Sequence, residues 1–118
     1  LVLSKVNGLW IPDAGHMNNY FTVYRGAATV NYIDCVFPNG ACSSNTTTSY
    51  TGCTFESVNG NSALWMYGNT TCTVDDGIFN GKKGIRLYSE GIAEMSTAAA
   101  SKNNLIVKNS EFNTETRF

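Results

Sequence analysis

The sequence predicts an all-β protein made of stacked coils, in which the strands of each coil run parallel to those of the next. Two observations predict this class: a five-residue phrase that recurs five times, and a second phrase with period two. The composition agrees, because Asn, Thr, Ser and Gly are abundant and there are only two prolines, as expected for short strands joined by polar turns. We expect residues 1–118 to form one domain, or a segment of a longer stack.

The first phrase reads variable, turn-former, small, variable, aromatic. Its turn-former is Asn, Asp or Gly, and its small residue is Gly, Cys or Ser. The five copies are VNGLW at 6–10, IDCVF at 33–37, TGCTF at 51–55, DDGIF at 75–79 and KNSEF at 108–112. Recurrence at intervals of about 18 to 33 residues indicates a chain that stacks on itself.

A short strand is predicted before each aromatic residue and another after it. In the first strand, apolar positions fall five and seven residues ahead of the aromatic; they are Val30/Tyr32, Thr48/Tyr50, Cys72/Val74 and Leu105/Val107, with Leu3 and Lys5 in the first copy. The later strand reads apolar, variable, apolar, Tyr and occurs at 21–24, 64–67 and 85–88. Its alternation predicts that Phe21/Val23, Leu64/Met66 and Ile85/Leu87 face a core.

Stacked coils place equivalent residues in rows. The aromatic row is Trp10, Phe37, Phe55, Phe79 and Phe112; the small row is Gly8, Cys35, Cys53, Gly77 and Ser110; the corner row is Asn7, Asp34, Gly52, Asp76 and Asn109. Corner residues of these types tolerate left-handed backbone. The alternative fold is an antiparallel β-sandwich with hairpins at the Asn-Gly pairs 39–40, 59–60 and 80–81. Hairpins do not explain why equivalent residues return in the same order.

This pattern resembles the right-handed parallel β-helix, the pectin-lyase-like architecture. It is most similar to repeat-rich surface and fibre proteins whose coils carry phrases of the Ile-x-Asn-Cys-x-Phe kind. The resemblance implies a right-handed coil with about five turns. Two segments depart from it: residues 41–45 lack the second phrase, and 89–104 form an insertion. No amphipathic helix covers either end of the predicted stack, so we expect ends without caps. The chain starts without an initiator Met or a signal peptide, which predicts a processed product or a segment of something longer.

The four cysteines are Cys35, Cys42, Cys53 and Cys72. They form no C-x-x-C pair, and with a single histidine, His16, they predict no metal site. Equivalent slots in successive coils put Cys35 and Cys53 about 4.8 Å apart, within disulfide reach. The alternative is that both are small buried hydrophobic residues. Cys42–Cys72 is the remaining pair in an oxidising compartment. Asn45 and Asn69 begin Asn-x-Thr sequons, which are candidate glycosylation sites only in a secreted eukaryotic protein.

Polysaccharide-cleaving β-helices use carboxylates or a basic residue on one outer face. The candidates here are Asp34, Asp75, Asp76, Lys83 and Arg86. Asp34 and Asp76 belong to the corner row, and there is no carboxylate cluster for Ca²⁺, so we predict no catalytic residue, no metal and no cofactor. His16 lies in a turn-rich stretch and is expected at the surface.

The candidate binding residues belong to the second phrase. If its apolar pairs face inward, Trp65, Arg86 and the row Tyr24, Tyr67 and Tyr88 face outward or edge the core. Aromatic rings with an Arg on a flat ladder can stack against sugar rings or contact a partner protein. The alternative is that the Tyr row packs under loops or inside the coil.

Charge and hydropathy exclude two classes of partner. The net charge is −1 without a Lys/Arg cluster, which argues against nucleic acid, and no apolar run is long enough for membrane insertion. We therefore predict a non-enzymatic structural or adhesive module of an extracellular, cell-surface or virion fibre protein. The expected partners are other copies of itself, joined end to end, a neighbouring structural protein, or glycans. The alternatives are a pectin-lyase-like carbohydrate-active enzyme and a carbohydrate-binding module.

Overall fold

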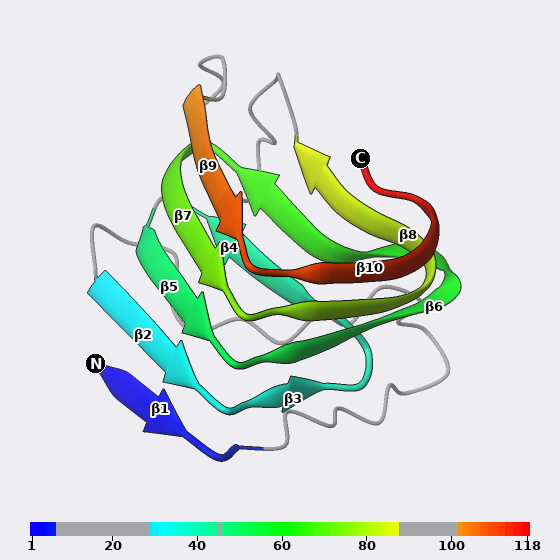
Figure 1. Ribbon diagram of the computed structural model, residues 1–118. Coiled ribbons are helices and arrows are strands. Elements are labelled where there is room, and N and C mark those ends of the chain that lie inside the picture. The colour runs from blue at the N-terminus through cyan, green and yellow to red at the C-terminus, as the bar shows by residue number, and fades with distance from the viewer. Residues whose placement is uncertain (7–28, 45, 88–101) are drawn as a thin grey trace, which may run out of the picture.

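The computed structural model describes residues 1–6, 29–44, 46–87 and 102–118, and these residues form ten strands and no helix (Figure 1). The strands make two sheets that face each other. The first sheet has the order β1-β2-β5-β7-β9, and the second has the order β10-β8-β6-β3, with β4 pairing β6. None of the described residues belongs to a helix that could span a membrane.

The chain passes from one sheet to the other and back. The first sheet consists of β1 (Val2–Ser4), β2 (Thr29–Ile33), β5 (Thr47–Thr51), β7 (Asn69–Asp75) and β9 (Lys102–Lys108). The second consists of β3 (Val36–Phe37), β4 (Ala41–Ser44), β6 (Thr54–Tyr67), β8 (Ile78–Leu87) and β10 (Glu111–Thr116). Every pairing between the described strands is parallel. The predicted all-β class with parallel strands is therefore confirmed.

The antiparallel alternative is wrong, because none of the three Asn-Gly pairs makes a hairpin. Asn39-Gly40 lies in the turn between β3 and β4, which both pair with β6. The pairs at 59–60 and 80–81 lie inside β6 and β8. Gly81 has φ +106° in the middle of its strand, and a Cβ there would lie 2.5 Å from the carbonyl oxygen of Ser57. Its glycine allows a close approach of two strands.

The predicted rows are confirmed from the second copy onward. Phe37 pairs with Phe55, Phe55 with Phe79, and Phe79 with Phe112. The rings of the last two pairs are stacked, with centroids 4.7 and 4.6 Å apart. Beside them Tyr32 stacks on Tyr50 at 4.7 Å. Each such aromatic contact contributes about 0.5–1.5 kcal/mol beyond the burial of area.

The corner row is confirmed by its backbone conformation. Asp34, Asp76 and Asn109 have φ between 51 and 55°, and Gly52 has φ 65°. Asx side chains tolerate this left-handed region better than most residues do. The residue after the corner must also be small, because a Cβ on Gly77 would lie 2.6 Å from Cγ1 of Val74.

In the first copy of the repeat, the prediction places the corner two residues too late in the chain. Ser4 pairs with Ile33, so the residue opposite the Asp34 corner is Lys5, which has φ 54°, and not Asn7. Leu3 consequently pairs with Tyr32. Hydrogen bonds continue this register, since Lys5 N donates to Ile33 O at 2.8 Å.

Residues 41–44 form a strand, although they lack the second phrase. Ala41 pairs with Leu64 and Ser43 with Met66, in the positions of the apolar pair. Ser43 is accepted there because its Oγ lies 2.8 Å from the buried hydroxyl of Tyr50 and shares a hydrogen bond with it. The predicted insertion is also shorter than expected, because β9 begins at Lys102.

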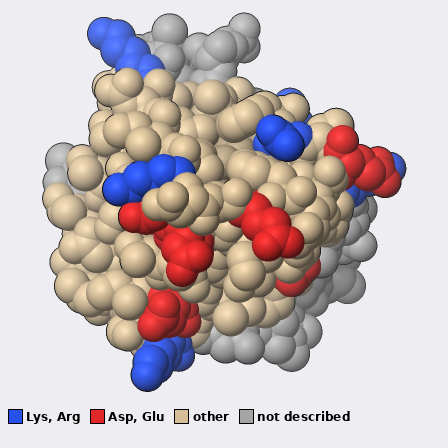
Figure 2. Space-filling model, in the orientation of Figure 1, with Lys and Arg blue, Asp and Glu red and all other residues tan. Residues whose placement is uncertain are grey.

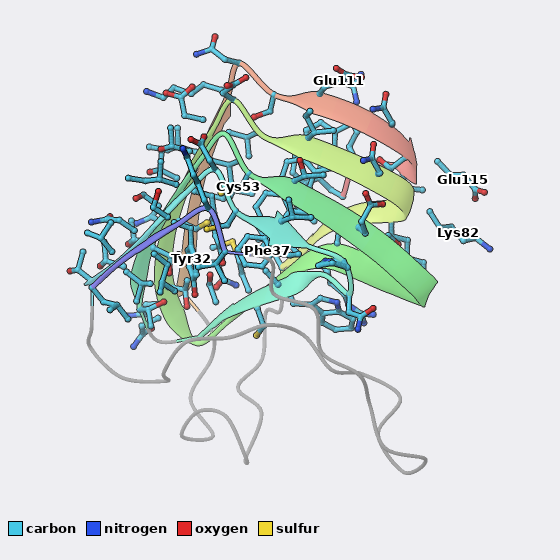
Figure 3. All side chains as sticks on the ribbon, turned by 90° about the horizontal axis from the view of Figure 1, so that it is seen from below. Tyr32, Phe37, Cys53, Lys82, Glu111 and Glu115 are labelled. Carbon is cyan, nitrogen blue, oxygen red and sulfur yellow. The ribbon has the colours of Figure 1, made fainter. Side chains whose placement is uncertain are left out.

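The core lies between the sheets. Figure 3 shows Tyr32, Phe37 and Cys53 between them, and Lys82, Glu111 and Glu115 outside. Phe37, Phe55 and Phe79 are completely buried, and full burial of such a side chain stabilises the fold by about 1.5–3 kcal/mol. The predictions for Trp10, His16, Phe21, Val23, Tyr24, Asn45 and Tyr88 lie outside the described residues.

Candidate functional site

The predicted binding residues Trp65 and Arg86 meet, but they do not form an exposed aromatic platform. They pair in β6 and β8, and the guanidinium carbon of Arg86 lies 4.8 Å from the ring centroid of Trp65. Trp65 is only 7% exposed, and its Nε1 donates to Ser62 O at 3.2 Å. A sugar ring therefore has no access to its face. Tyr67 lies in β6, while Tyr24 and Tyr88 are outside the described residues.

The two candidate disulfides are not formed. Cys35, Cys42, Cys53 and Cys72 are free and buried. Sγ of Cys35 lies 3.4 Å from the carbonyl oxygen of Leu3, and Sγ of Cys53 lies 3.6 Å from that of Tyr32. Burial raises the pKa of the Cys53 thiol to about 11 and that of Cys72 to about 12. Both thiols are therefore protonated at neutral pH and poor nucleophiles.

The candidate carboxylates serve the fold. Asp34 and Asp76 are corner residues. Asp75 accepts a hydrogen bond from Nδ2 of Asn109 at 2.9 Å and pairs with Nζ of Lys108 at 3.2 Å, and these two partners lower its pKa. A carboxyl group with a lowered pKa is a poor general acid at neutral pH. Among the described residues there is no group of three side chains that could hold a metal ion.

The most regular surface is the outer face of the first sheet. Its first column contains Thr29, Thr47 and Thr71, which pair in turn and are all exposed. Its second column contains Asn31, Ser49 and Thr73, also paired in turn and half-buried. We call these six residues the hydroxyl face. Neighbouring strands set a spacing of about 4.8 Å along each column, and alternate residues set about 6.6 Å between columns.

No family model, curated protein or solved structure matches this chain. The hydroxyl face itself carries no charged residue. Next to it, at the corner end of the strands, Asp75 and Lys108 neutralise each other. Figure 2 shows that charged side chains on the visible side are scattered among uncharged ones. The face can thus offer hydrogen bonds to a neutral ligand without attracting ions.

One hydrogen bond fixes part of the hydroxyl face. Ser49 Oγ donates to Asn31 Oδ1 at 2.6 Å, which orients the Asn31 amide on the rigid sheet. Asn69 precedes Thr71 on the same side of β7 and is exposed, so its sequon lies at the border of this face. The inward residues of 29–33, 47–51 and 71–75 predict these strands, but their outward residues form a common face only once the register of the strands is known. The signal in the sequence is Thr, Ser or Asn at the first and third positions of each of these segments.

A second polar ladder lies outside the second sheet. Asn80 Nδ2 donates to Glu56 Oε1 at 3.1 Å, and Asn113 Nδ2 donates to Asn80 Oδ1 at 3.0 Å. Each side-chain amide of this ladder donates a hydrogen bond to a residue on the neighbouring strand. The ladder therefore supports the pairing of the strands, whereas Thr29, Thr47 and Thr71 of the first sheet are exposed.

Proposed function

We propose that this chain is a right-handed parallel β-helix segment of about five coils that acts as a non-enzymatic structural and adhesive module. The supporting observation for the architecture is the register, since the aromatic residues of β3, β6, β8 and β10 pair in one row. A right-handed coil is supported by the strong preference of parallel crossovers for that hand. The proposed location is extracellular, on a cell surface or a virion fibre.

The proposed ligand of the module is an extended neutral polysaccharide. The observation that carries this proposal is the hydroxyl face: it is exposed along Thr29, Thr47 and Thr71, uncharged, and built on a parallel sheet. A polysaccharide presents hydroxyl groups at regular intervals, and both partners can donate and accept. The Thr methyl groups offer apolar contact to the faces of sugar rings.

The binding mode follows from the small energy of each contact. A net hydrogen bond contributes about 0.5–1.5 kcal/mol, so a single hydroxyl cannot hold a polymer. Several hydroxyls on one sheet can, because the paired strands hold their backbones in place and the β-branched Thr side chain has few χ1 rotamers, so little entropy is lost on binding. The face therefore favours a long, repetitive ligand over a single sugar. A catalytic role has no support from Asp75, whose pKa is lowered.

The test is co-sedimentation of the chain with cellulose and with chitin. The double variant T47V/T71V removes two exposed hydroxyls and keeps the β-branched shape. At about 0.5–1.5 kcal/mol per hydrogen bond, its affinity is expected to fall roughly 5- to 150-fold. The matched control is T116V, an exposed threonine on β10 in the second sheet, which should bind like the wild type.

Two results would reject the proposed ligand. One is that the wild type sediments with neither polymer. The other is that T47V/T71V and T116V lose affinity equally, because the effect would then come from stability and not from the hydroxyl face. Circular dichroism of each variant separates loss of binding from loss of fold.

A further inference from the structure

The two ends of the stack carry the only hydrophobic residues among the described ones that pack on the core without being buried. Leu3 and Val6 lie at the β1 end, and Leu105, Val107 and Phe112 lie at the β9 and β10 end. In the middle of the stack the equivalent residues, such as Tyr50 and Phe55, are covered on both sides and buried. The described residues thus leave part of the core row uncovered at each end.

The register shows which residues of β1 would meet β9 if the stack continued. Val2 pairs with Asn31, Asn31 with Ser49, Ser49 with Thr73, and Thr73 with Ile106. If a second copy continued the sheet beyond β9, its Val2 would therefore lie beside Ile106 in this column. Val2 and Ile106 are each 59% exposed. The two ends therefore present matching apolar residues in the same column.

The neighbouring columns match as well. Leu3 would lie on Val107, so that two half-buried core residues cover each other. Ser4 would lie on Lys108 and Lys5 on Asn109, so no like charges meet among these pairs. Lys5 has φ 54° and Asn109 has φ 51°, so the corners at the two ends have the same backbone shape and can stack as the inner corners do.

We propose that copies of this chain associate head to tail, with β1 of one copy pairing in parallel with β9 of the next in the register that puts Val2 beside Ile106. The proposal rests on the stacked-coil architecture of the proposed function. In Figure 1 these two strands lie at opposite ends of the first sheet, so each copy can take part in two such contacts. Repetition of the contact gives a rod on which the hydroxyl faces follow one another.

Disulfide trapping tests the register directly. The test uses the full chain carrying V2C and I106C. In neighbouring copies, the Cα atoms of the two new cysteines would lie about 4.8 Å apart, within the ~4.4–6.8 Å Cα–Cα range of disulfides. The natural cysteines are buried and react slowly. Mild oxidation should give a ladder of trimers and larger species on non-reducing gels. The matched control V2C/I78C places the second thiol on the outer face of β8 in the second sheet, outside the proposed contact of β1 with β9, and should give no such ladder.

A third double variant keeps this test separate from the test of the fold. N31C/S49C joins β2 to β5 within one copy, where the residues pair. If N31C/S49C crosslinks internally but V2C/I106C gives no more ladder than V2C/I78C, head-to-tail association is wrong and the stacked fold stands. If neither pair crosslinks, the stacked fold itself is wrong. Head-to-tail pairing gives no crosslink in V2C alone or in I106C alone, so dimers of both single variants would show that like ends meet and would overturn the proposal.

Sedimentation velocity over a concentration series provides the measurement without a covalent bond. The mean mass of the wild type should rise with concentration. I106K should weaken this association roughly tenfold or more, because the burial of one large apolar side chain is lost. I78K introduces the same change at a residue that is 38% exposed and lies in the second sheet, in β8, outside the proposed contact of β1 with β9, and it should associate like the wild type. A wild type that stays monomeric over the whole series would overturn head-to-tail association.

Discussion

The two sheets keep their register to different extents. The first sheet holds one register through all of its pairings, from β1 to β9. The second sheet begins in register at Phe37, Phe55 and Phe79, but the pairing of β6 with β8 shifts between Ser57 and Ser62. The regular part of the molecule thus surrounds the corner, and irregularity begins a few residues beyond the aromatic row.

The corner explains this difference. Backbone hydrogen bonds join each corner to the next coil: Asp34 N donates to Thr51 O at 2.8 Å, and Gly52 N donates to Asp75 O at 3.0 Å. These bonds, with the left-handed residues, fix the chain where it leaves the first sheet and enters the second. Between Ser57 and Ser62, β6 has more residues than the facing part of β8, and the pairing accommodates the extra residues as an irregularity of the bulge type. Residues near the corner therefore specify the stack.

Single-residue insertions give the largest contrast between the sheets. An alanine inserted between Thr48 and Ser49 in β5 moves the inward residues of that strand to the outer face and should cost most of the stability of about 5–15 kcal/mol that a domain has. An alanine inserted within 58–61 of β6, where the register already shifts, should cost about 1 kcal/mol. Urea unfolding followed by circular dichroism measures both. Equal losses would mean that the corner has no special role.

Truncation of the aromatic row should depend on the position in the stack. Phe55 is completely buried between Phe37 and Phe79, so F55A is expected to lower the free energy of unfolding by about 3–5 kcal/mol. Phe112, at the end of the row, is only partly buried, and F112A should cost about half as much. Chemical denaturation of both variants checks the order. A larger loss for F112A would contradict the end position of β10.

The corner row can be tested at one residue. Asp76 has φ 55°, a conformation that costs a β-branched residue about 1–2 kcal/mol. D76V should be less stable by about that amount, while D76G should keep or slightly raise the stability because glycine adopts this conformation freely. Thermal unfolding of the two variants measures this difference in stability. Equal destabilisation would assign the effect to the lost carboxylate and not to the backbone.

The smallest expected effect concerns Asp75 beside the corner. Its pKa is lowered first by the Asn109 hydrogen bond and then by Lys108, so the stabilising contribution is present above the unfolded-state pKa and is lost as the pH falls through the folded-state pKa. N109G removes this hydrogen bond and keeps the left-handed backbone of residue 109; it should raise the pKa of Asp75 toward its usual value, so that the loss is smaller and is complete at a higher pH. A pH titration of the carboxyl resonance by NMR measures this. Since the group is at the surface, little change in stability at pH 7 is expected.

Sequence patterns predicted the parts of the fold that repeat a physical requirement. Only small or turn-forming residues fit beside the stacked rings and at the corners, so Cys53, Gly77 and Asp76 could be placed without a structure. Strand β4 could not, because Ser43 replaces an apolar residue and is stabilised by Tyr50, a contact between segments that no local pattern contains. The Lys5 corner was missed for a similar reason, since strand pairing determines its backbone.

The candidate site was predicted less well than the fold. The contact of Trp65 with Arg86 followed from their equal places in the second phrase, but the burial of Trp65 depends on how neighbouring groups cover it. The hydroxyl face requires the register of β2, β5 and β7 before its columns can be recognised. The core restricts which residue types can face inward, so inward positions can be recognised from the sequence. Outward residues form a surface only together with their neighbours on the next strand, which the sequence does not identify.

The most direct test of the account is a set of NMR cross-strand contacts in the wild-type chain. The stacked fold predicts parallel-sheet nuclear Overhauser effects that join Asn31 to Ser49 and Ser49 to Thr73, residues that pair across β2, β5 and β7. It also predicts ring contacts between Phe55 and Phe79. Antiparallel contacts across Asn39-Gly40 and Asn80-Gly81, with no contact from Asn31 to Ser49, would contradict the stack and restore a hairpin fold.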